Sequence, residues 1–170
     1  MIKAKLLYLK DKQFFAIVDG ARRFLGKPMD VGKKLKKEGY DLLHIIDEDL
    51  KRDSDTNFDA YNSLTYLMNV EVECGDKDKL LIKLLTVKVR IVVKLPTKLD
   101  LGKYKESKLL VGSIDADFDG NVEHVNDLII ESATNESIEK FSKSNRILVY
   151  EKDFDKLNEK SKKKVFGVIE

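Results

Sequence analysis

The chain has 170 residues, of which 42% are hydrophobic and 36% are charged, and its formal net charge is +2. This length is enough for one substantial buried core, and the apolar share is that of a globular protein rather than a disordered or membrane-embedded one. Because positive and negative residues are mixed and nearly balanced, the charge favours neither nucleic acid nor a membrane surface as a partner.

The cysteine content and the N-terminal segment indicate the cellular compartment. Cys74 is the single cysteine, so the chain cannot form an internal disulfide, which is typical of proteins in a reducing environment. Residues 1–10 carry lysines inside their apolar run, unlike a signal peptide, and no apolar stretch is long enough to span a bilayer. We therefore predict a cytoplasmic protein.

Short apolar runs of strand length alternate with amphipathic segments along the chain. Strands are predicted at residues 6–9, 14–18, 41–47, 70–74, 89–95, 109–115, 147–150 and 165–169. The run at 41–47 is almost continuously apolar, which is typical of a strand covered on both faces. The segment Asp11-Lys12-Gln13 is predicted to be the turn of a hairpin between the first two runs.

Signals for helices lie between these strands. Helices are predicted at residues 28–39, 57–67, 76–85, 100–106 and 125–141, with a short polar helix between the last two strands. Pro28 suits the first turn of a helix, Gly39 suits its end, and Asn57 is a favourable cap. Thr134-Asn135 is a candidate interruption of the helix at 125–141.

The order of the elements indicates the fold class. Strands that alternate with helices favour parallel pairing with right-handed crossovers. Asp119-Gly120 is a strong hairpin signal between Ile114 and Val122. Without the hairpin strand at 14–18, seven main strands are predicted, and no Pro-, Gly- or Ser-rich linker divides the chain. The prediction is an α/β protein with a single domain over residues 1–170, a TIM-barrel-like βα repeat that forms an incomplete barrel of about seven strands.

Two blocks of the sequence resemble a known family. One begins at Pro28-Met-Asp-Val31 and continues through Glu38-Gly39-Tyr-Asp-Leu-Leu-His44-Ile-Ile-Asp47; the other is Gly112-Ser-Ile-Asp115-Ala-Asp-Phe-Asp-Gly120-Asn-Val122. They are similar to the phosphoribosylformimino-aminoimidazole-carboxamide ribotide isomerases, barrels of histidine biosynthesis. The resemblance runs from Lys5 to about Leu157. It implies that the second block is the fifth barrel strand and that residues 147–155 are the sixth strand and its loop.

The resemblance also implies a chemistry. These isomerases convert an aminoaldose into an aminoketose with two acid–base groups at the C-terminal ends of strands one and five, and they hold two phosphate groups on glycine-rich loops. Asp115 falls on the fifth-strand acid, whereas Tyr8 occupies the first-strand acid position. After strand three the glycine run is reduced to Gly75, the remaining candidate phosphate-binding residue. Asp47, after strand two, is a further candidate for the catalytic pocket.

These departures favour a divergent relative that lacks standard ribotide isomerase activity and binds a phosphorylated sugar or another phosphorylated small molecule, or a protein partner. The alternative is an active aldose–ketose isomerase that uses Asp115 as acid and base, with Tyr8, Asp47 or Asp11 as its partner. Asp115 and Asp47 could equally be turn or capping residues, and His44 is predicted to be a core or lining histidine.

No cofactor or metal is predicted, because two histidines and one cysteine do not form a metal-ligand pattern. A barrel that ends after seven strands would leave edges near Leu6 and Val168 without neighbours. Such edges bind other chains, and a two-fold pair is the commonest arrangement. We therefore predict a homodimer, with Phe166 and Val168 near the contact.

Overall fold

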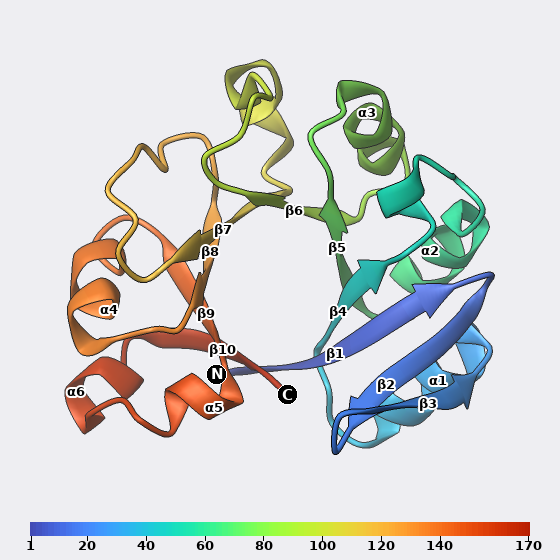
Figure 1. Cartoon of the computed structure of the whole chain (residues 1–170), viewed down its shortest axis with the longest axis horizontal. Helices are drawn as coiled ribbons and strands as arrows, with labels where there is room; N and C mark the ends of the chain where they lie inside the picture. The colour runs from blue at the N-terminus through green and yellow to red at the C-terminus, as the bar shows by residue number, and fades with distance from the viewer.

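The computed structural model describes residues 1–170, apart from the side chain of Cys74. Its centre is a closed barrel of eight parallel strands, with an antiparallel hairpin added at one side (Figure 1). The barrel strands are β1 (Ile2–Lys10), β4 (Leu42–Asp47), β5 (Asn69–Cys74), β6 (Arg90–Lys94), β7 (Leu110–Asp115), β8 (Asp127–Glu131), β9 (Arg146–Tyr150) and β10 (Val165–Ile169). The α/β class and the parallel barrel are therefore confirmed.

Short helices surround the barrel (Figure 1). They are α1 (Pro28–Lys37), α2 (Phe58–Thr65), α3 (Asp78–Thr86), α4 (Asn135–Phe141), α5 (Glu151–Phe154) and α6 (Glu159–Lys162), with 3₁₀ helices η1 (Leu50–Arg52) and η2 (Leu101–Ser107). In α1, Pro28 stands in the first turn, where its missing N–H is not needed, and Val31 and Leu35 are buried. The main core lies between such apolar helix faces and the outward-facing strand residues.

The barrel has eight strands, and the predicted count of about seven is wrong. Residues 127–131 form β8, although they were predicted to belong to a helix at 125–141. The run Asp-Leu-Ile-Ile-Glu is apolar in the middle and buried on both faces, so it lacks the alternation that marks a half-buried strand. The helical part starts only at α4, where Thr134 and Ser137 form a capping box.

The predicted hairpin at Asp119-Gly120 is also wrong. Strands β7 and β8 are parallel neighbours, paired from Val111 with Asp127 to Asp115 with Glu131. The segment 116–126 is therefore a crossover loop, because parallel strands cannot be joined by a tight turn. With β8 present, residues 146–150 form the seventh barrel strand instead of the sixth.

Direct pairing of the first and last strands closes the barrel. β1 pairs in parallel with β10 through Ile2 with Gly167, Lys3 with Val168 and Ala4 with Ile169. The open edge near Leu6 and Val168 is therefore absent, and the homodimer prediction loses the reason on which it was based.

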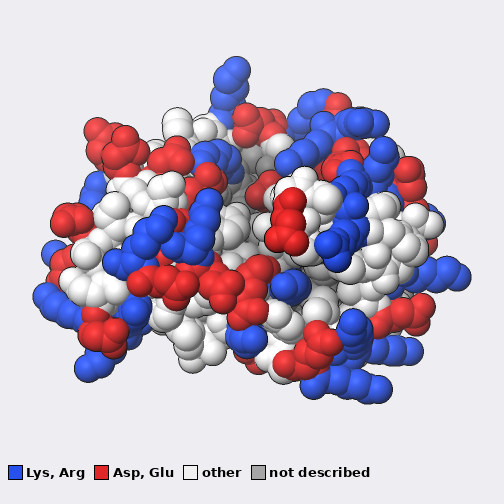
Figure 2. All heavy atoms as spheres, turned by 60° about the horizontal axis from the view of Figure 1, so that its bottom comes forward, with Lys and Arg blue, Asp and Glu red and all other residues white. Residues whose placement is uncertain are grey.

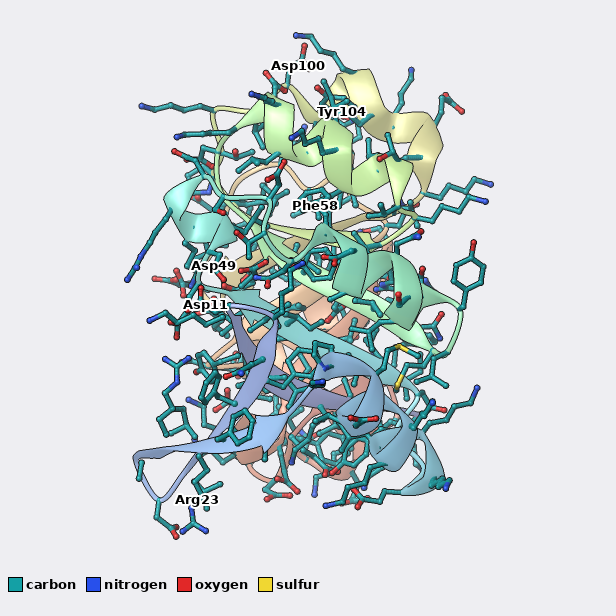
Figure 3. All side chains as sticks on the ribbon, turned by 90° about the vertical axis from the view of Figure 1, so that its right-hand side faces the viewer. Asp11, Arg23, Asp49, Phe58, Asp100 and Tyr104 are labelled. Atoms are coloured by element: carbon teal, nitrogen blue, oxygen red, sulfur yellow. The ribbon has the colours of Figure 1, made fainter. Side chains whose placement is uncertain are left out.

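The predicted turn at Asp11-Lys12 is confirmed and joins β1 to β2 (Gln13–Val18). The chain then turns again into β3 (Ala21–Gly26), a strand that was not predicted. This hairpin exposes several apolar side chains, among them Ile17, Phe24 and Leu25. Figure 3 shows the tip of the hairpin, near Arg23, extending away from the barrel. Within the described residues, no helix has the length and hydropathy needed to cross a membrane.

The inside of the barrel divides into an apolar and a charged part. Seven buried apolar side chains form an interior cluster: Ala4, Leu42, Val92, Val111, Ile129, Leu148 and Ile169. The residues two positions along the same strands also point inward, because side chains on one face recur with a period of two. On β4 the next inward residue is His44. On the neighbouring strand β5 the inward residues are Glu71 and Glu73, and Glu73 lies near the carboxyl end of the barrel.

Candidate functional site at the carboxyl end of the barrel

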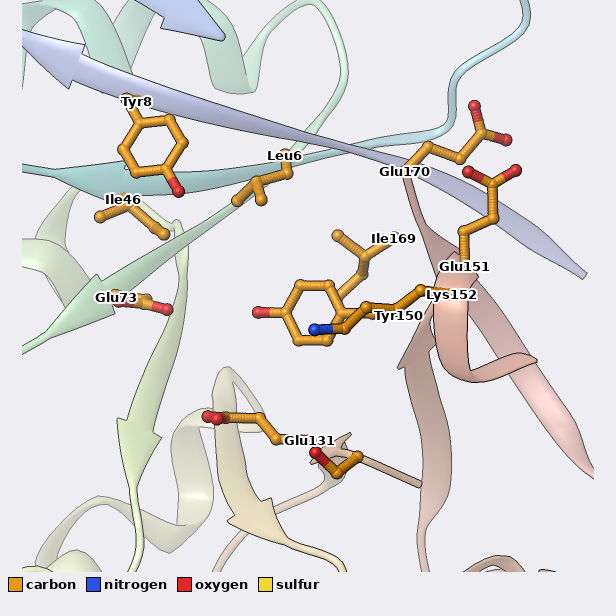
Figure 4. A pocket seen from close by; sticks show the side chains of 11 residues that line it. Leu6, Tyr8, Ile46, Glu73, Glu131, Tyr150, Glu151, Lys152, Ile169 and Glu170 are labelled. Carbon is orange, nitrogen blue, oxygen red and sulfur yellow. The ribbon is translucent and has the colours of Figure 1, made fainter. Parts of the chain in front are cut away.

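A cavity of about 520 Å³ opens at the carboxyl ends of the barrel strands. It is lined by Leu6, Tyr8, Ile46, Glu73, Glu131, Ser132, Tyr150, Glu151, Lys152, Ile169 and Glu170. In Figure 4, the polar ends of Tyr8, Glu73, Glu131, Tyr150 and Lys152 point towards its centre from different sides. Parallel strands bring these distant residues together because all carboxyl ends lie at one end of the barrel.

Glu131, the last residue of β8, belongs to a small charged group at the rim. Its carboxylate accepts hydrogen bonds from Lys94 Nζ at 2.8 Å and from Ser113 Oγ at 2.9 Å. Lys94 also donates to Asp115 at 3.2 Å. Burial alone would lower the pKa of Lys94, but the hydrogen bonds to Glu131 and Asp115 raise it. Lys94 is therefore an ammonium at neutral pH and unsuited to act as a free-amine nucleophile.

Glu73, at the other side of the cavity, lies next to a buried histidine. His44 is fully buried; its Nδ1 lies 2.8 Å from Glu71 Oε1 and its Nε2 lies 3.7 Å from Glu73 Oε1. Burial raises the pKa of Glu73, but the nearby His44 and, to a smaller extent, Lys51 outweigh this effect and lower that pKa overall. Glu73 is therefore an ionised carboxylate at neutral pH, with 31% of its side chain exposed to the cavity.

The charged residues continue below Glu73 through the barrel. Glu71 Oε2 lies 3.3 Å from Arg90 Nε, and Arg90 Nη2 donates to Asp127 at 2.5 Å. Asp127 also accepts two hydrogen bonds from Arg146, at 2.7 and 2.9 Å. Glu71 and Asp127 are both buried, where an unpaired charge would be costly, and each carboxylate contacts an arginine.

Tyr150 completes the wall of the cavity. Its ring meets the His44 ring edge-on, with centroids 6.3 Å apart. Burial raises the pKa of the Tyr150 hydroxyl most, and the negative charges of Glu73 and Glu131 raise it further. The phenol therefore stays neutral and can donate a hydrogen bond to a bound molecule.

Two of the predicted catalytic residues are placed at this end of the barrel. Tyr8 lines the cavity, and its hydroxyl points inward (Figure 4). Asp115 ends the fifth barrel strand, as the resemblance implied, but 63% of its side chain is exposed and it contacts the cavity only through Lys94 and Glu131.

Asp47 lies outside the cavity, on the outer face of β4. Its carboxylate accepts hydrogen bonds from the backbone N–H groups of Asp49 and Leu50, from Asn57 Nδ2 and from the Tyr61 hydroxyl. Burial raises the pKa of Asp47, against the effect of these hydrogen bonds.

Asp11, the other residue considered as a partner of Asp115, lies in the turn between β1 and β2 and contacts the loop after β4. Its backbone N–H donates to Asp49 Oδ2 at 2.7 Å, and Figure 3 shows Asp11 and Asp49 side by side. Asp11 thus lies at the tip of the first hairpin.

Gly75 follows β5 without lining the cavity. Its φ lies outside the left-handed range, and a Cβ placed there would meet nothing within 4 Å. The protein fold itself therefore does not require glycine at this position.

Several residues of the cavity were missed by sequence reasoning. Glu131 was hidden by the helix predicted at 125–141, and Tyr150 and Lys94 carry no motif. The signal that could have found them is positional: each ends, or nearly ends, an apolar strand run, and those ends meet in a parallel barrel.

The described part of the chain holds no group of three or more His, Cys, Asp or Glu residues that could hold a metal ion. Acidic and basic side chains alternate over the face shown in Figure 2, without the continuous basic stripe that nucleic-acid binding needs. A comparison with protein-family models finds no match, and a comparison with curated proteins finds none either.

Proposed function

We propose that the cavity at the barrel mouth is the active site of an enzyme that moves protons on a small hydroxylated substrate. The observation that carries this proposal is the convergence of Tyr8, Glu73, Glu131, Tyr150 and Lys152 on one cavity (Figure 4). Two carboxylates, two phenols and an amine side chain supply proton acceptors and donors around one space. Such groups are the elements of general acid–base catalysis.

The charges of the lining favour a substrate without a phosphate group. Glu73, Glu131, Glu151 and Glu170 line the cavity, and Lys152 is the one lining cation. Lys94, nearby, already pairs with Glu131 and Asp115. A phosphate dianion would therefore meet mostly like charge. We accordingly favour an unphosphorylated hydroxy-carbonyl compound over the phosphorylated ligand expected from the sequence.

A proton-transfer sequence that fits these groups is an aldose–ketose isomerisation. The Glu73 carboxylate removes the proton from the carbon next to the carbonyl, while the Lys152 ammonium donates a proton to the carbonyl oxygen, which gives a neutral enediol. Glu73 then returns its proton to the former carbonyl carbon, and the second hydroxyl returns a proton to Lys152. The product is the ketose, and both side chains regain their starting states. In this scheme Tyr8 and Tyr150 hold the substrate oxygens.

Deuterium exchange tests the proposal directly, because it detects proton abstraction whatever product is formed. In D₂O, the wild-type protein should incorporate deuterium next to the carbonyl of at least one of a panel of unphosphorylated aldoses, ketoses and amino sugars, as followed by proton NMR. Glu73→Gln should lower the exchange rate about 100-fold or more, because the amide cannot accept the proton.

Glu106→Gln is the matched control for that loss, since Glu106 is an exposed carboxylate on η2, away from the cavity. It should leave the exchange rate unchanged. No exchange with any unphosphorylated compound would contradict the proposal, and exchange confined to phosphorylated sugars would restore the phosphorylated ligand.

We further predict that the chain does not rescue a strain lacking the histidine-pathway ribotide isomerase. Tyr8 stands at the first-strand acid position, and Gly75 is the single glycine after the third strand, next to Glu73 and Asp76. The ribotide would therefore lack both an acid–base partner and a phosphate-binding loop. Growth of the complemented strain without histidine would show this expectation to be wrong, and loss of growth with Asp115→Asn would then identify the acid.

A further inference from the structure

His44 lies directly beneath the proposed active site, on the inner face of β4. Two carboxylates face its ring from β5: Glu71 at Nδ1 and Glu73 at Nε2. From β9 it meets the neutral Tyr150 ring, and from β1 its paired neighbour is the uncharged Leu6. Two cations lie beyond these carboxylates: Arg90 on β6 contacts Glu71, and Lys51 of η1 contacts Glu73.

The two-sided contact determines the charge of the ring. A neutral imidazole has one N–H and one lone pair, so one of its nitrogens would present a lone pair to a carboxylate. An imidazolium has an N–H on both sides and can donate to Glu71 while Nε2 faces Glu73. Nε2 lies 3.7 Å from Glu73 Oε1, beyond hydrogen-bond distance, and has no other hydrogen-bond partner, so a proton on this nitrogen would face that carboxylate.

Charge balance inside the barrel leads to the same result. The interior carboxylates are Glu71, Glu73 and Asp127, and the arginines that contact them are Arg90 and Arg146. Arg146 and Lys51, which pairs with Glu73 at 3.5 Å, are more than half exposed, so with a neutral His44 the two fully buried carboxylates, Glu71 and Asp127, would share one largely buried cation, Arg90. Protonation of His44 supplies a second buried cation and removes an uncompensated buried charge, which is costly in a protein interior.

We infer that His44 is a positioning residue that is charged at neutral pH, an imidazolium fixed by Glu71 that keeps Glu73 ionised and aimed into the cavity. This role deepens the proposed function, on which it rests, since Glu73 is the proton acceptor there. His44 does not itself contact the cavity and acts through Glu73. Consistent with this geometry, burial would lower the pKa of His44, but the hydrogen bond to Glu71 and the nearby Glu73 carboxylate raise it to about 9.

NMR on the ¹⁵N-labelled wild-type protein tests the charge of His44 directly. The ring should show two protonated nitrogens at pH 7.5, where an unperturbed histidine is mostly neutral. His124, the other histidine, lies exposed on the loop 116–126 and serves as the internal comparison. A neutral His44 ring at pH 7.5 would overturn the inference, whatever the exchange experiment gives.

The effect on Glu73 is measured in variants. In His44→Gln, the carbon-13 shift of the Glu73 carboxyl should report a proton affinity raised about tenfold or more, because the adjacent cation is gone. The acid limb of the pH–rate profile for deuterium exchange should move to higher pH by the same factor. A purely structural role for His44 would lower the rate at every pH and leave that limb in place, and this result would refute the positioning role.

Two features keep the test decisive. If His44→Gln does not fold, Glu73→Gln, which changes a partly exposed residue, provides the reciprocal measurement: it should lower the proton affinity of His44, and an unchanged affinity would contradict the coupling. If the wild-type protein exchanges no substrate, the proposed function fails while the NMR titrations of His44 and Glu73 still decide whether the two residues are coupled.

Discussion

Replacing Glu71 with glutamine should lower the free energy of unfolding by about 3–5 kcal/mol, the usual cost of breaking a buried ion pair by removing one partner. Glu71 is fully buried between His44 and Arg90. The amide keeps the shape of the side chain but leaves both cations without their shared counter-ion. At about 2–4 °C per kcal/mol for a domain of this size, the melting temperature should fall by roughly 10 °C. Thermal unfolding followed by circular dichroism measures it.

The pH dependence of stability separates this electrostatic loss from a packing defect. The pKa of His44 is about 9 in the folded protein, against 6.5 for an unperturbed histidine side chain. Its stabilising contribution should therefore be complete below about pH 6.5 and should disappear as the pH rises through about 9. In Glu71→Gln this decline should largely vanish. Glu106→Gln should keep both the wild-type stability and the decline; equal stability of Glu71→Gln and wild type would show that the buried pair contributes nothing.

Asp47→Ala should destabilise the protein by roughly 3 kcal/mol or more, because it removes the acceptor for four donors at once. Two of these are backbone N–H groups of the loop at 49–50, and the others belong to Asn57 and Tyr61. Without the carboxylate, the loop between β4 and α2 loses the group that holds it against the barrel. Urea unfolding, analysed for its midpoint and slope, is the measurement.

Asp47→Asn is the matched control, since its remaining carbonyl oxygen can still accept from the loop N–H groups. It should cost clearly less than the alanine variant. If both variants were as stable as the wild type but inactive in deuterium exchange, Asp47 would be catalytic and its structural role would be refuted.

The elements of this fold that could be predicted were those with a clear local sequence pattern. The continuous apolar run before Asp47 and the short runs ending at Asp115 and Tyr150 became barrel strands, because such runs can be buried only in a sheet covered on both faces. The run 127–131 has the same character, but it lies beside a strong helix cap at Thr134, and the two signals were merged into one helix.

The candidate site was only partly predictable, for a different reason. Tyr8 and Asp115 were predicted because they align with the two acid positions of the family that the sequence resembles. Glu131 and Tyr150 become neighbours of Tyr8 only after the chain has closed on itself. Their roles depend on the order of strands around the barrel, which no local pattern encodes. His44 was correctly predicted to be buried. Its two carboxylate neighbours come from another strand and could not be predicted from the sequence around His44.

The pairing of β1 with β10 has a consequence for how the protein folds. The other pairings around the barrel join strands that follow one another along the chain, apart from the short detour of the first hairpin. This last one joins Ile2 to Gly167, so almost the entire chain must be looped before it can form. The entropy cost of such a loop is about 4–5 kcal/mol. Ring closure should therefore be the late, slow step of folding, preceded by an open, curved sheet whose two free edges are exposed to solvent and to other chains.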